Sequence, residues 1–169
     1  MYPSQGDLMT IKLRKLIRND RSSIENFLSR INVFDDKDVA LALELLDTDL
    51  DHPSQKDYIH WVATNDRDQA IGFVCYGPTP LTEGTNSLYW IAVDPDYAGQ
   101  GIGTLLLQNV ENGLRDENAR LLILETSSGQ DYTLSRQFYL KNGYRIAEII
   151  KDYYREGEDR VTFLKVLRG

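Results

Sequence analysis

Three alternating glycines, Gly99, Gly101 and Gly103, separate an apolar run that ends at Val93 from a segment with helical periodicity. Glycine lets the backbone come close to a ligand, and the first turn of a helix carries about half a positive charge. A strand, a glycine turn and a helix start in this order can hold a phosphate or pyrophosphate with backbone N–H groups alone. The same residues could also form only a tight connection, so the turn is a candidate phosphate site.

The residues beside the last glycine do not fit two common nucleotide-binding motifs. A Walker loop requires Lys and then Ser or Thr after its final glycine, whereas Thr104 and Leu105 follow Gly103. A dinucleotide fingerprint that starts at either earlier glycine would need Gly or Ala where Thr104 or Leu106 stands. Nucleotide hydrolysis is therefore excluded, and the phosphate ligand stays open at this point.

A second candidate for chemistry is Glu125, which directly follows the apolar run Leu121–Leu124. Open α/β sheets bind ligands at the carboxyl ends of their strands, which is where this carboxylate is expected. Partial burial there would make it a useful base, acting directly or through water. The alternative is a structural role, in which Glu125 pairs with a nearby arginine or caps a turn.

Other reactive residue types are less favoured. Cys75 lies in the apolar segment Ile71–Tyr76, which is typical of a buried strand, and a single cysteine forms no internal disulfide. The two histidines, His52 and His60, are not favoured as bases, because His60 alternates with apolar residues on an expected strand. A serine or cysteine hydrolase is disfavoured because no Gly-x-Ser-x-Gly elbow is present and Cys75 has no evident partner.

Periodicity predicts the elements that position these residues. We expect strands over Ile11–Ile17, Tyr58–Thr64, Ala70–Tyr76, Leu88–Val93, Leu121–Leu124, Arg145–Tyr153 and Arg160–Leu167. We expect four helices. The first begins at Asn19 or Asp20, the second at Asp35 or Asp36, and the fourth covers Tyr132–Lys141. The third follows the glycine turn and is expected to point Leu105, Leu106, Val110 and Leu114 inward. The runs Leu88–Val93 and Leu121–Leu124 are predicted to be buried on both faces.

The order of these elements predicts an α/β fold. A strand, a helix and a strand between Leu88 and Leu124 imply one parallel crossover, and the other strands complete a mixed sheet of about seven strands with helices on both faces. The chain has 169 residues, of which 41% are hydrophobic and 27% charged, so we expect a single domain over 1–169 with a frayed segment at 1–8.

Two separated motifs carry a family resemblance. The first is Ile91-Ala92-Val93-Asp94-Pro95 followed by the glycine turn, and the second is Phe138-Tyr139-Leu140-Lys141-Asn142-Gly143-Tyr144. Together with the element order, they resemble the GNAT family of acetyl-CoA-dependent N-acetyltransferases over nearly the whole chain. The chain departs from the family pattern at Ala98, where Arg or Gln is usual, and at Tyr132, where Asn is often found.

The resemblance implies an enzyme that uses acetyl-CoA as cosubstrate and no metal. It implies a cofactor site made of Ile91, Ala92, Val93, Gly99, Gln100, Gly101, Ile102, Gly103, Thr104 and Phe138. The backbone of Ile91–Val93 would serve the pantetheine arm and the acetyl carbonyl, and the glycine turn would serve the pyrophosphate. Tyr139 would protonate the departing sulfur. Leu124-Glu125-Thr126 is similar to the context of the catalytic base in the branch that acetylates protein N-termini.

Charge and hydropathy limit the classes of partner that we expect for this chain. With 26 acidic and 19 basic residues the net charge is −7, which argues against nucleic acid. The longest apolar run is too short to span a bilayer, and Met1–Thr10 lacks the features of a signal peptide. We therefore expect a cytoplasmic protein without a membrane partner, as a monomer or a homodimer.

The acceptor is the least determined feature. Residues 35–57 contain eight acids and two lysines and form an acidic stretch, which is either a solvated surface or an attractor for a cationic amine. We expect a small cationic amine as acceptor, with a protein N-terminus or a lysine as the alternative. A protein of another class, an acyl-CoA-binding module without catalysis, also fits the resemblance.

Overall fold

The computed structural model describes residues 9–168, and the segment 1–8 that we expected to be frayed lies outside the described residues. The strands are β1 Lys12–Lys15, β2 Ile59–Thr64, β3 Ala70–Pro78, β4 Thr85–Val93, β5 Leu121–Ser127, β6 Arg145–Arg155 and β7 Glu158–Val166. The helices are α1 Asp20–Leu28, α2 Asp36–Asp51, α3 Ile102–Asp116 and α4 Thr133–Lys141, with short 3₁₀ turns η1 at Pro95–Tyr97 and η2 at Gln130–Tyr132.

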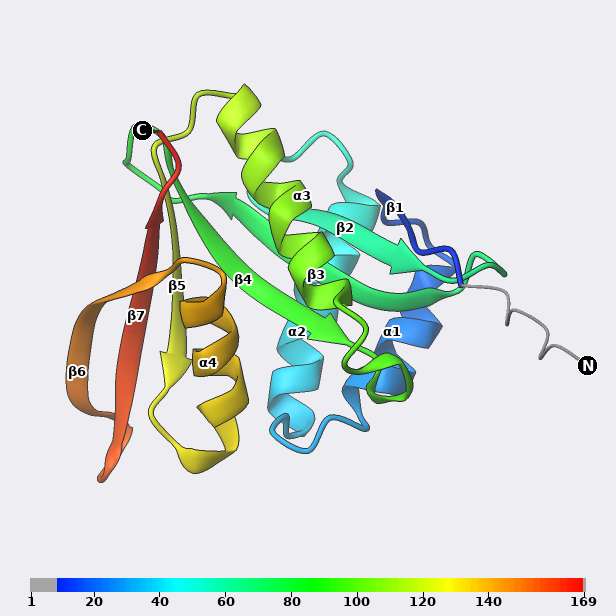
Figure 1. Ribbon diagram of the computed structural model, residues 1–169. Coiled ribbons are helices and arrows are strands. Elements are labelled where there is room, and N and C mark those ends of the chain that lie inside the picture. The colour runs from blue at the N-terminus through cyan, green and yellow to red at the C-terminus, as the bar shows by residue number, and fades with distance from the viewer. Residues whose placement is uncertain (1–8, 169) are drawn as a thin grey trace, which may run out of the picture.

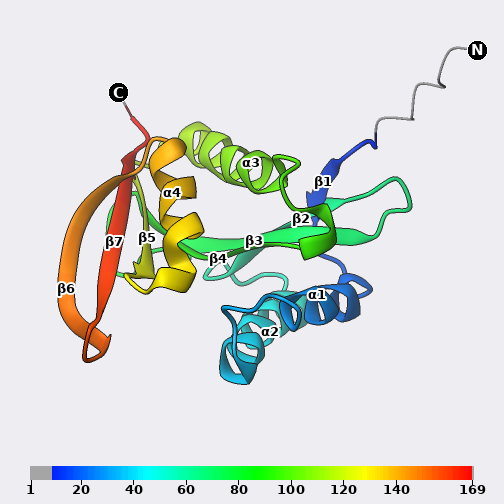
Figure 2. The same ribbon diagram turned by 60° about the horizontal axis from the view of Figure 1, so that its bottom comes forward.

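The strands form one sheet in the order β1-β2-β3-β4-β5-β7-β6 (Figure 1). Neighbouring strands are antiparallel except β4 and β5, which are parallel and joined through α3, as the sequence predicts. Helices α1 and α2 cover one face, and α3 and α4 cover the other (Figure 2). The predicted α/β class with a seven-stranded mixed sheet is confirmed. Within residues 9–168, no helix has the length and apolar character needed to cross a membrane.

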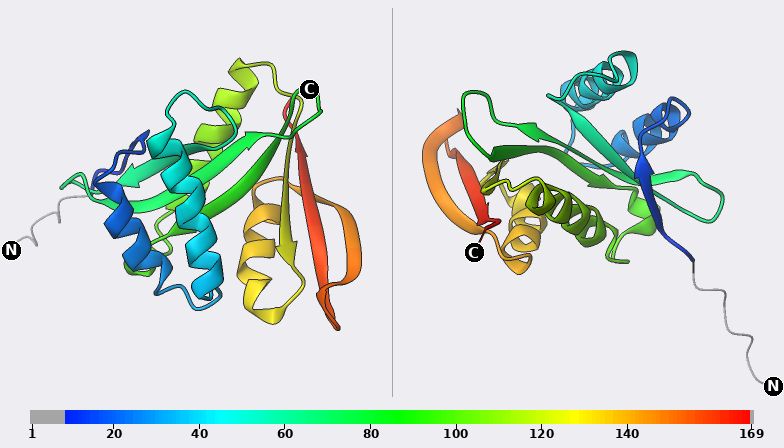
Figure 3. Two further views of the ribbon diagram at one scale, coloured as in Figure 1. Left: turned by 180° about the vertical axis from the view of Figure 1, so that it is seen from behind. Right: turned by 90° about the horizontal axis from the view of Figure 1, so that it is seen from above.

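Each face of the sheet carries its own core. Under α1 and α2, whose positions are clearest from behind the molecule (Figure 3), Phe27 and Leu46 pack with Phe73 of β3. Under α3, the buried stripe includes Leu107, whereas Leu105, which we predicted to face inward, is 37% exposed. That prediction is wrong because the helix begins at Ile102, which turns its apolar stripe toward the sheet at positions 102, 106, 107, 110 and 114.

The two central strands are less buried than predicted. In β4, Tyr89 is 38% exposed, and in β5 only Leu122 and Leu124 of the apolar run are buried. The reason is that α1 and α2 contact β3 and β2, whereas no helix within residues 9–168 covers the face of β5 that points away from α3 and α4. Side chains at alternate positions of β5 therefore face an open side of the sheet.

The helix starts differ in how they are capped. Asp35 caps α2 as predicted, and its carboxylate accepts hydrogen bonds from the backbone N–H groups of Lys37 and Asp38, each at 2.9 Å. Asn19 makes no side-chain cap on α1. Instead the buried Asp20 accepts a hydrogen bond from the Ile17 N–H at 2.9 Å.

The negative charge of Asp20 is compensated by Arg14, whose two terminal nitrogens donate to the carboxylate oxygens at 2.7 and 2.9 Å. Arg14 also donates to Asp68 in the turn between β2 and β3 at 2.8 Å. One guanidinium therefore joins β1, the start of α1 and the first hairpin. Because Asp20 is only 3% exposed, its charge depends on this partner.

We predict that Arg14→Met lowers the free energy of unfolding by about 3 kcal/mol, because it leaves a buried carboxylate without its partner. Urea unfolding measures the loss. The matched control is Arg18→Met, since Arg18 pairs with Asp51 on the surface, with side chains 65% and 55% exposed, and such pairs contribute at most about 1 kcal/mol. Equal destabilisation by both substitutions would contradict the buried role of Arg14.

Candidate active site

The parallel strands β4 and β5 separate shortly after they begin to pair. They are paired only where Thr85–Ser87 faces Leu121–Ile123, and they then diverge toward their carboxyl ends (Figure 1). β5 continues along β7 as far as Ser127, and β4 continues along β3. The edge of β4 that would face β5 is therefore unpaired over residues 88–93. We call this opening the split; its free N–H and C=O groups can bind an extended ligand as an added strand would bind.

The backbone beside the split carries a bulge. Cys75 pairs with Trp90 and Tyr76 with Leu88, so Tyr89 is an extra residue in β4. Bulges bend a strand and re-aim its groups, and they are common next to active sites. Ile91–Val93, the segment that the resemblance assigns to the pantetheine arm, follows directly after this bulge.

The glycine turn lies at the carboxyl end of the same strand. Gly99 and Gly101 have φ angles of +76° and +77°, and a Cβ on either would meet no atom within 4 Å, so both border open space. The N–H of Leu105 donates to the carbonyl of Gly101 at 3.0 Å, which begins the hydrogen-bonded ladder of α3. The amides of residues 102–104 precede that bond and have no partner within the helix. They are available to an anion.

The turn also touches the second motif. A Cβ on Gly103 would lie 3.4 Å from the ring of Phe138 in α4, so glycine lets the start of α3 pack closely against α4. The structure thus brings together the glycine turn and Phe138, two parts of the predicted cofactor site that are 35 residues apart in the sequence.

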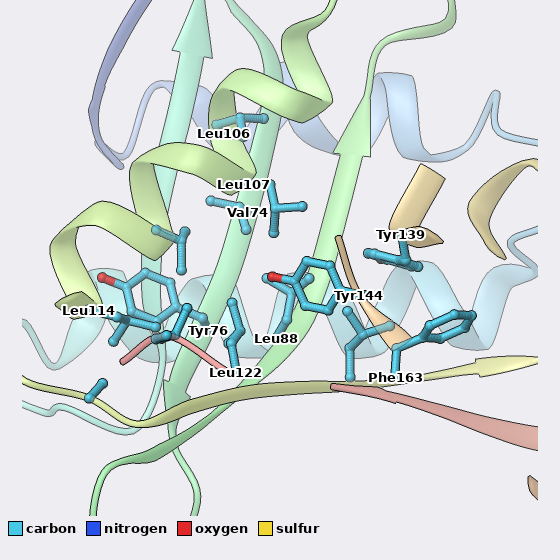
Figure 4. Close-up of a cluster of buried hydrophobic side chains, with 14 of the residues drawn as sticks. Val74, Tyr76, Leu88, Leu106, Leu107, Leu114, Leu122, Tyr139, Tyr144 and Phe163 are labelled. Atoms are coloured by element: carbon cyan, nitrogen blue, oxygen red, sulfur yellow. The ribbon is translucent and has the colours of Figure 1, made fainter. Parts of the chain in front are cut away.

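Tyr139 lies in α4 on the same face of the sheet as α3. It is 8% exposed, and its ring packs against Phe138, Tyr144 and Phe163 at centroid distances of 5.3, 5.8 and 5.6 Å. Tyr139, Tyr144 and Phe163 lie together at one end of the core cluster (Figure 4). Burial raises the pKa of Tyr139, so its hydroxyl stays protonated and can act as an acid.

Glu125 lies on the opposite face of the sheet from Tyr139, because its neighbour Leu124 points into the core under α3 and α4. Its side chain is 49% exposed, and one oxygen lies 3.3 Å from Nη1 of Arg160. Glu125 is therefore more exposed than expected, since none of the described helices covers this side of β5. The ion pair that we named as the structural alternative is present, and it leaves half of the carboxylate side chain open to solvent.

Sequence reasoning missed Arg160, the residue that organises this side of the split. Its guanidinium also lies 3.3 Å from a carboxylate oxygen of Glu148 and 4.7 Å from the ring centre of Tyr153. The signal was the alternation of the polar residues Arg160 and Thr162 with the apolar residues Val161 and Phe163 in β7. This alternation points the two polar side chains to the face that carries Glu125.

The loop between α1 and α2 reaches the same face. The ring of Phe34 meets the ring of Trp90 in β4 edge-on at 5.2 Å. The hydroxyl of Tyr132 donates to the carbonyl of Val33 at 3.4 Å. Aromatic side chains therefore lie beside the split, on the face of the sheet that α1 and α2 cover.

The acids of the acidic stretch have different partners at the two ends of α2. Asp47 and Asp51 form ion pairs with Arg21 and Arg18 at 2.7 Å, toward the end of α2. Asp35 and Asp38, at the start of α2, act instead on Tyr132 in η2. Burial is the main cause that raises the pKa of Tyr132, and the carboxylates of Asp38, Glu158 and Asp35 raise it further. Asp35 and Asp38 thus lie near Tyr132, whereas Asp47 and Asp51 are already paired with arginines.

The less favoured residues lie elsewhere. His60 is buried under α2, where its Nδ1 lies 2.9 Å from a carboxylate oxygen of Asp49. His52 follows the end of α2 and is exposed. Cys75 is buried as predicted, and burial raises the pKa of its thiol.

Comparisons with known proteins agree on one family. Residues 56–146 match the family described as "Acetyltransferase (GNAT) domain". An uncharacterized N-acetyltransferase of Methanocaldococcus jannaschii is 34% identical over 83 residues, which are 48% of this chain and 52% of that protein. The chain therefore matches about half the length of that relative.

Solved structures extend the comparison. A crystal structure from Desulfovibrio desulfuricans, assigned to GNAT acetyltransferases, has a TM-score of 0.90 and 34% identity, and covers 94% of this chain and 100% of that one. An aminoglycoside 6'-N-acetyltransferase complexed with coenzyme A has a TM-score of 0.71 at 16% identity, and covers 94% and 98%. The second likeness concerns the fold alone.

We predict that Gly101→Val weakens acetyl-CoA binding tenfold or more, about 1.4 kcal/mol, because a side chain would enter the open space in front of the α3 amides. Calorimetric titration with acetyl-CoA measures the change. The matched control is Gly157→Val, since Gly157 also has a positive φ, +82°, and open space around it, but lies in the turn between β6 and β7. Equal affinity in a folded Gly101→Val variant would contradict this location of the pyrophosphate.

Proposed function

The chain belongs to the GNAT family of acetyltransferases, and we propose that it transfers the acetyl group of acetyl-CoA to the primary amine of a small cationic acceptor. The observation that carries this proposal is the split in the sheet next to the glycine turn. An extended thioester in the split would be flanked by Tyr139 on one face of the sheet and by Glu125 on the other.

The features of acetyl-CoA match the groups available. The unpaired edge of β4 offers backbone hydrogen bonds to the amide groups of a pantetheine arm, over Ile91–Val93 in particular. The open turn before α3 offers amides and the positive end of the helix dipole to the pyrophosphate. Because these donors belong to the backbone, the site needs no basic side chain at Ala98.

The reaction requires one proton to be removed and another to be supplied. An amine has a pKa of roughly 10.4 and a thiol of roughly 8.5, so the acceptor must lose a proton before it attacks the acetyl carbon. Glu125 takes that proton, directly or through water. The neutral amine attacks, the new C–N bond forms, the C–S bond breaks, and the departing thiolate takes a proton from the Tyr139 hydroxyl. The nitrogen gives up its second proton through water, which restores the Tyr139 hydroxyl, and the proton taken by Glu125 leaves to solvent, so one proton is released per turnover. Backbone N–H groups of β4 stabilise the oxyanion between these steps.

A cationic acceptor is supported by what surrounds the split. Asp35 and Asp38 stand near Tyr132 at the start of α2, and Glu125 itself is half exposed. The aromatic rings of Phe34, Trp90 and Tyr153 can contact the apolar part of an amine-bearing chain or its charge. A protein N-terminus or a lysine has the same reacting group and is the alternative acceptor.

We predict distinct effects for the two proton-transfer groups. Tyr139→Phe lowers kcat by roughly 10² to 10⁴ while acetyl-CoA affinity is kept, because the ring stays in place and only the acid is lost. In the wild type, kcat does not fall through ionisation of Tyr139 up to a pH of about 10, the ordinary pKa of tyrosine, since burial raises its pKa above that value.

Glu125→Gln shifts or removes the acidic limb of the kcat/KM profile, because it removes the proposed base. Steady-state rates against pH measure both effects.

Glu148→Gln is the control for Glu125→Gln, because Glu148 contacts the same guanidinium at the same distance, 3.3 Å, from β6. If both substitutions change the acidic limb equally, the effect comes from releasing Arg160, and Glu125 is not the base. Full turnover of Tyr139→Phe where chemistry limits the rate would remove Tyr139 from the acid role.

We predict that cationic amines are the best acceptors in a panel containing spermidine, an aminoglycoside, amino acid amides, neutral amines and an N-terminal peptide. Release of coenzyme A measures turnover at low salt and at about 0.15 M ionic strength, where exposed charges are screened beyond about 8 Å. For cationic acceptors kcat/KM falls severalfold with added salt. Preference for neutral acceptors without salt dependence would show that the acidic stretch is only a solvated surface, and acetyl-CoA binding without any turnover would indicate a binding module.

A further inference from the structure

A carboxylate is buried inside the apolar face of α3. Glu111 is 3% exposed and lies in the stripe between Leu107 and Leu114, beside Val110. A charge in such a place is costly unless it is paired and hydrogen-bonded. It was not singled out in the sequence, although one acid within an apolar stripe is an evident signal.

Glu111 has strong partners on two other elements. One carboxylate oxygen accepts a hydrogen bond from the Tyr144 hydroxyl at 2.9 Å, and the other accepts one from Lys165 Nζ at 2.8 Å. Arg115, one turn later in α3, lies 3.6 Å away. The carboxylate therefore joins α3 to β7 and to the segment that follows α4.

Both partners of Glu111 hold the end of α4. Lys165 Nζ also donates to the carbonyl of Asn142, the C-cap residue of the helix, at 2.8 Å. The backbone N–H of Tyr144 donates to the carbonyl of Tyr139 at 3.0 Å. The last turn of α4 is thus tied to α3 through Glu111, and that turn carries Tyr139.

The side chains are coupled as well. The ring of Tyr144 packs edge-on against the ring of Tyr139 with 5.8 Å between their centres (Figure 4). The Glu111 bond fixes the far end of the Tyr144 ring, so it limits how the Tyr139 ring can turn. α3 and α4 also approach each other directly at Gly103 and Phe138, at the beginning of α3.

We propose that Glu111 is a positioning residue for the acetyl transfer, acting through Tyr144 and Lys165 to hold Tyr139 in register with the start of α3. This inference rests on the proposed function, in which the start of α3 binds pyrophosphate and Tyr139 protonates the sulfur. Both groups must act on one cofactor molecule, so their relative position decides whether the acid reaches the sulfur once the pyrophosphate is bound. Well-packed apolar residues would stabilise the core at least as well as a buried ion pair, so stability alone does not account for the charge.

A double-mutant cycle tests the proposal. Tyr144→Phe removes the hydrogen bond to Glu111 and keeps the ring against Tyr139. We expect kcat to fall about tenfold with the best acceptor of the panel, and KM for acetyl-CoA to stay within about twofold, because only the acid is displaced. In a Tyr139→Phe background the same substitution should leave kcat unchanged, since it acts through a hydroxyl that is already absent. Tyr76→Phe is the control, because Tyr76 is 7% exposed in the same core cluster but lies in β3.

A second readout is independent of turnover. Tyr144→Phe and Glu111→Gln should speed amide hydrogen exchange at residues 142–144 while exchange in β3 stays unchanged. If Tyr144→Phe does not fold, Glu111→Gln tests the link through Lys165, because the amide oxygen can still accept from Tyr144 whereas the charged contact with Lys165 is lost.

The outcomes separate the two proposals. A folded Tyr144→Phe variant with full kcat, an equal loss in both backgrounds, or unchanged exchange at 142–144 would overturn the role of Glu111 while leaving the acetyl transfer intact. Absence of turnover in the wild type, with normal exchange differences between variants, would overturn the proposed function while leaving the structural link intact.

Discussion

The short pairing of β4 with β5 is the constraint on which the rest of the site depends. Only three residue pairs join these parallel strands, and each strand then follows its other neighbour. A sheet that stayed closed would satisfy these backbone groups internally and would leave no place for a ligand. The split instead leaves donors and acceptors unpaired in the middle of the molecule, where the elements on both faces can contribute side chains to them.

Helix α3 connects the two halves of this arrangement. Its first turn has amides without a partner in the helix next to the open space around Gly101, and its buried face packs on the sheet. Farther along, Glu111 reaches Tyr144 and Lys165 and so fixes the end of α4. A single helix therefore connects the proposed pyrophosphate site to the helix that carries Tyr139, which suits an enzyme that must hold one long cosubstrate at both ends.

Local patterns predicted the parts of the fold that depend on neighbours in the sequence. The cap at Asp35, the hairpin of β2 and β3, and the turn with Gly99 and Gly101 follow from turn chemistry and periodicity. The split did not follow, because it depends on which strand competes for each edge. The exposure of Glu125 also depends on tertiary structure, since it is decided by the absence of a helix over one face of β5. Pairing of Glu125 with an arginine was named only as an alternative, and the partner, Arg160, was not identified because it lies far away in the sequence.

Hydrogen–deuterium exchange with and without saturating acetyl-CoA tests the central claim most directly, that the split and the turn before α3 form one cosubstrate site. We expect slower exchange at residues 88–93, for the amides that do not face β3, and at residues 99–104. Residues 59–64 in β2 should be unaffected, because they lie away from the split. Acetyl-CoA that binds by calorimetry yet protects neither segment, or protects a different face of the sheet, would contradict the account.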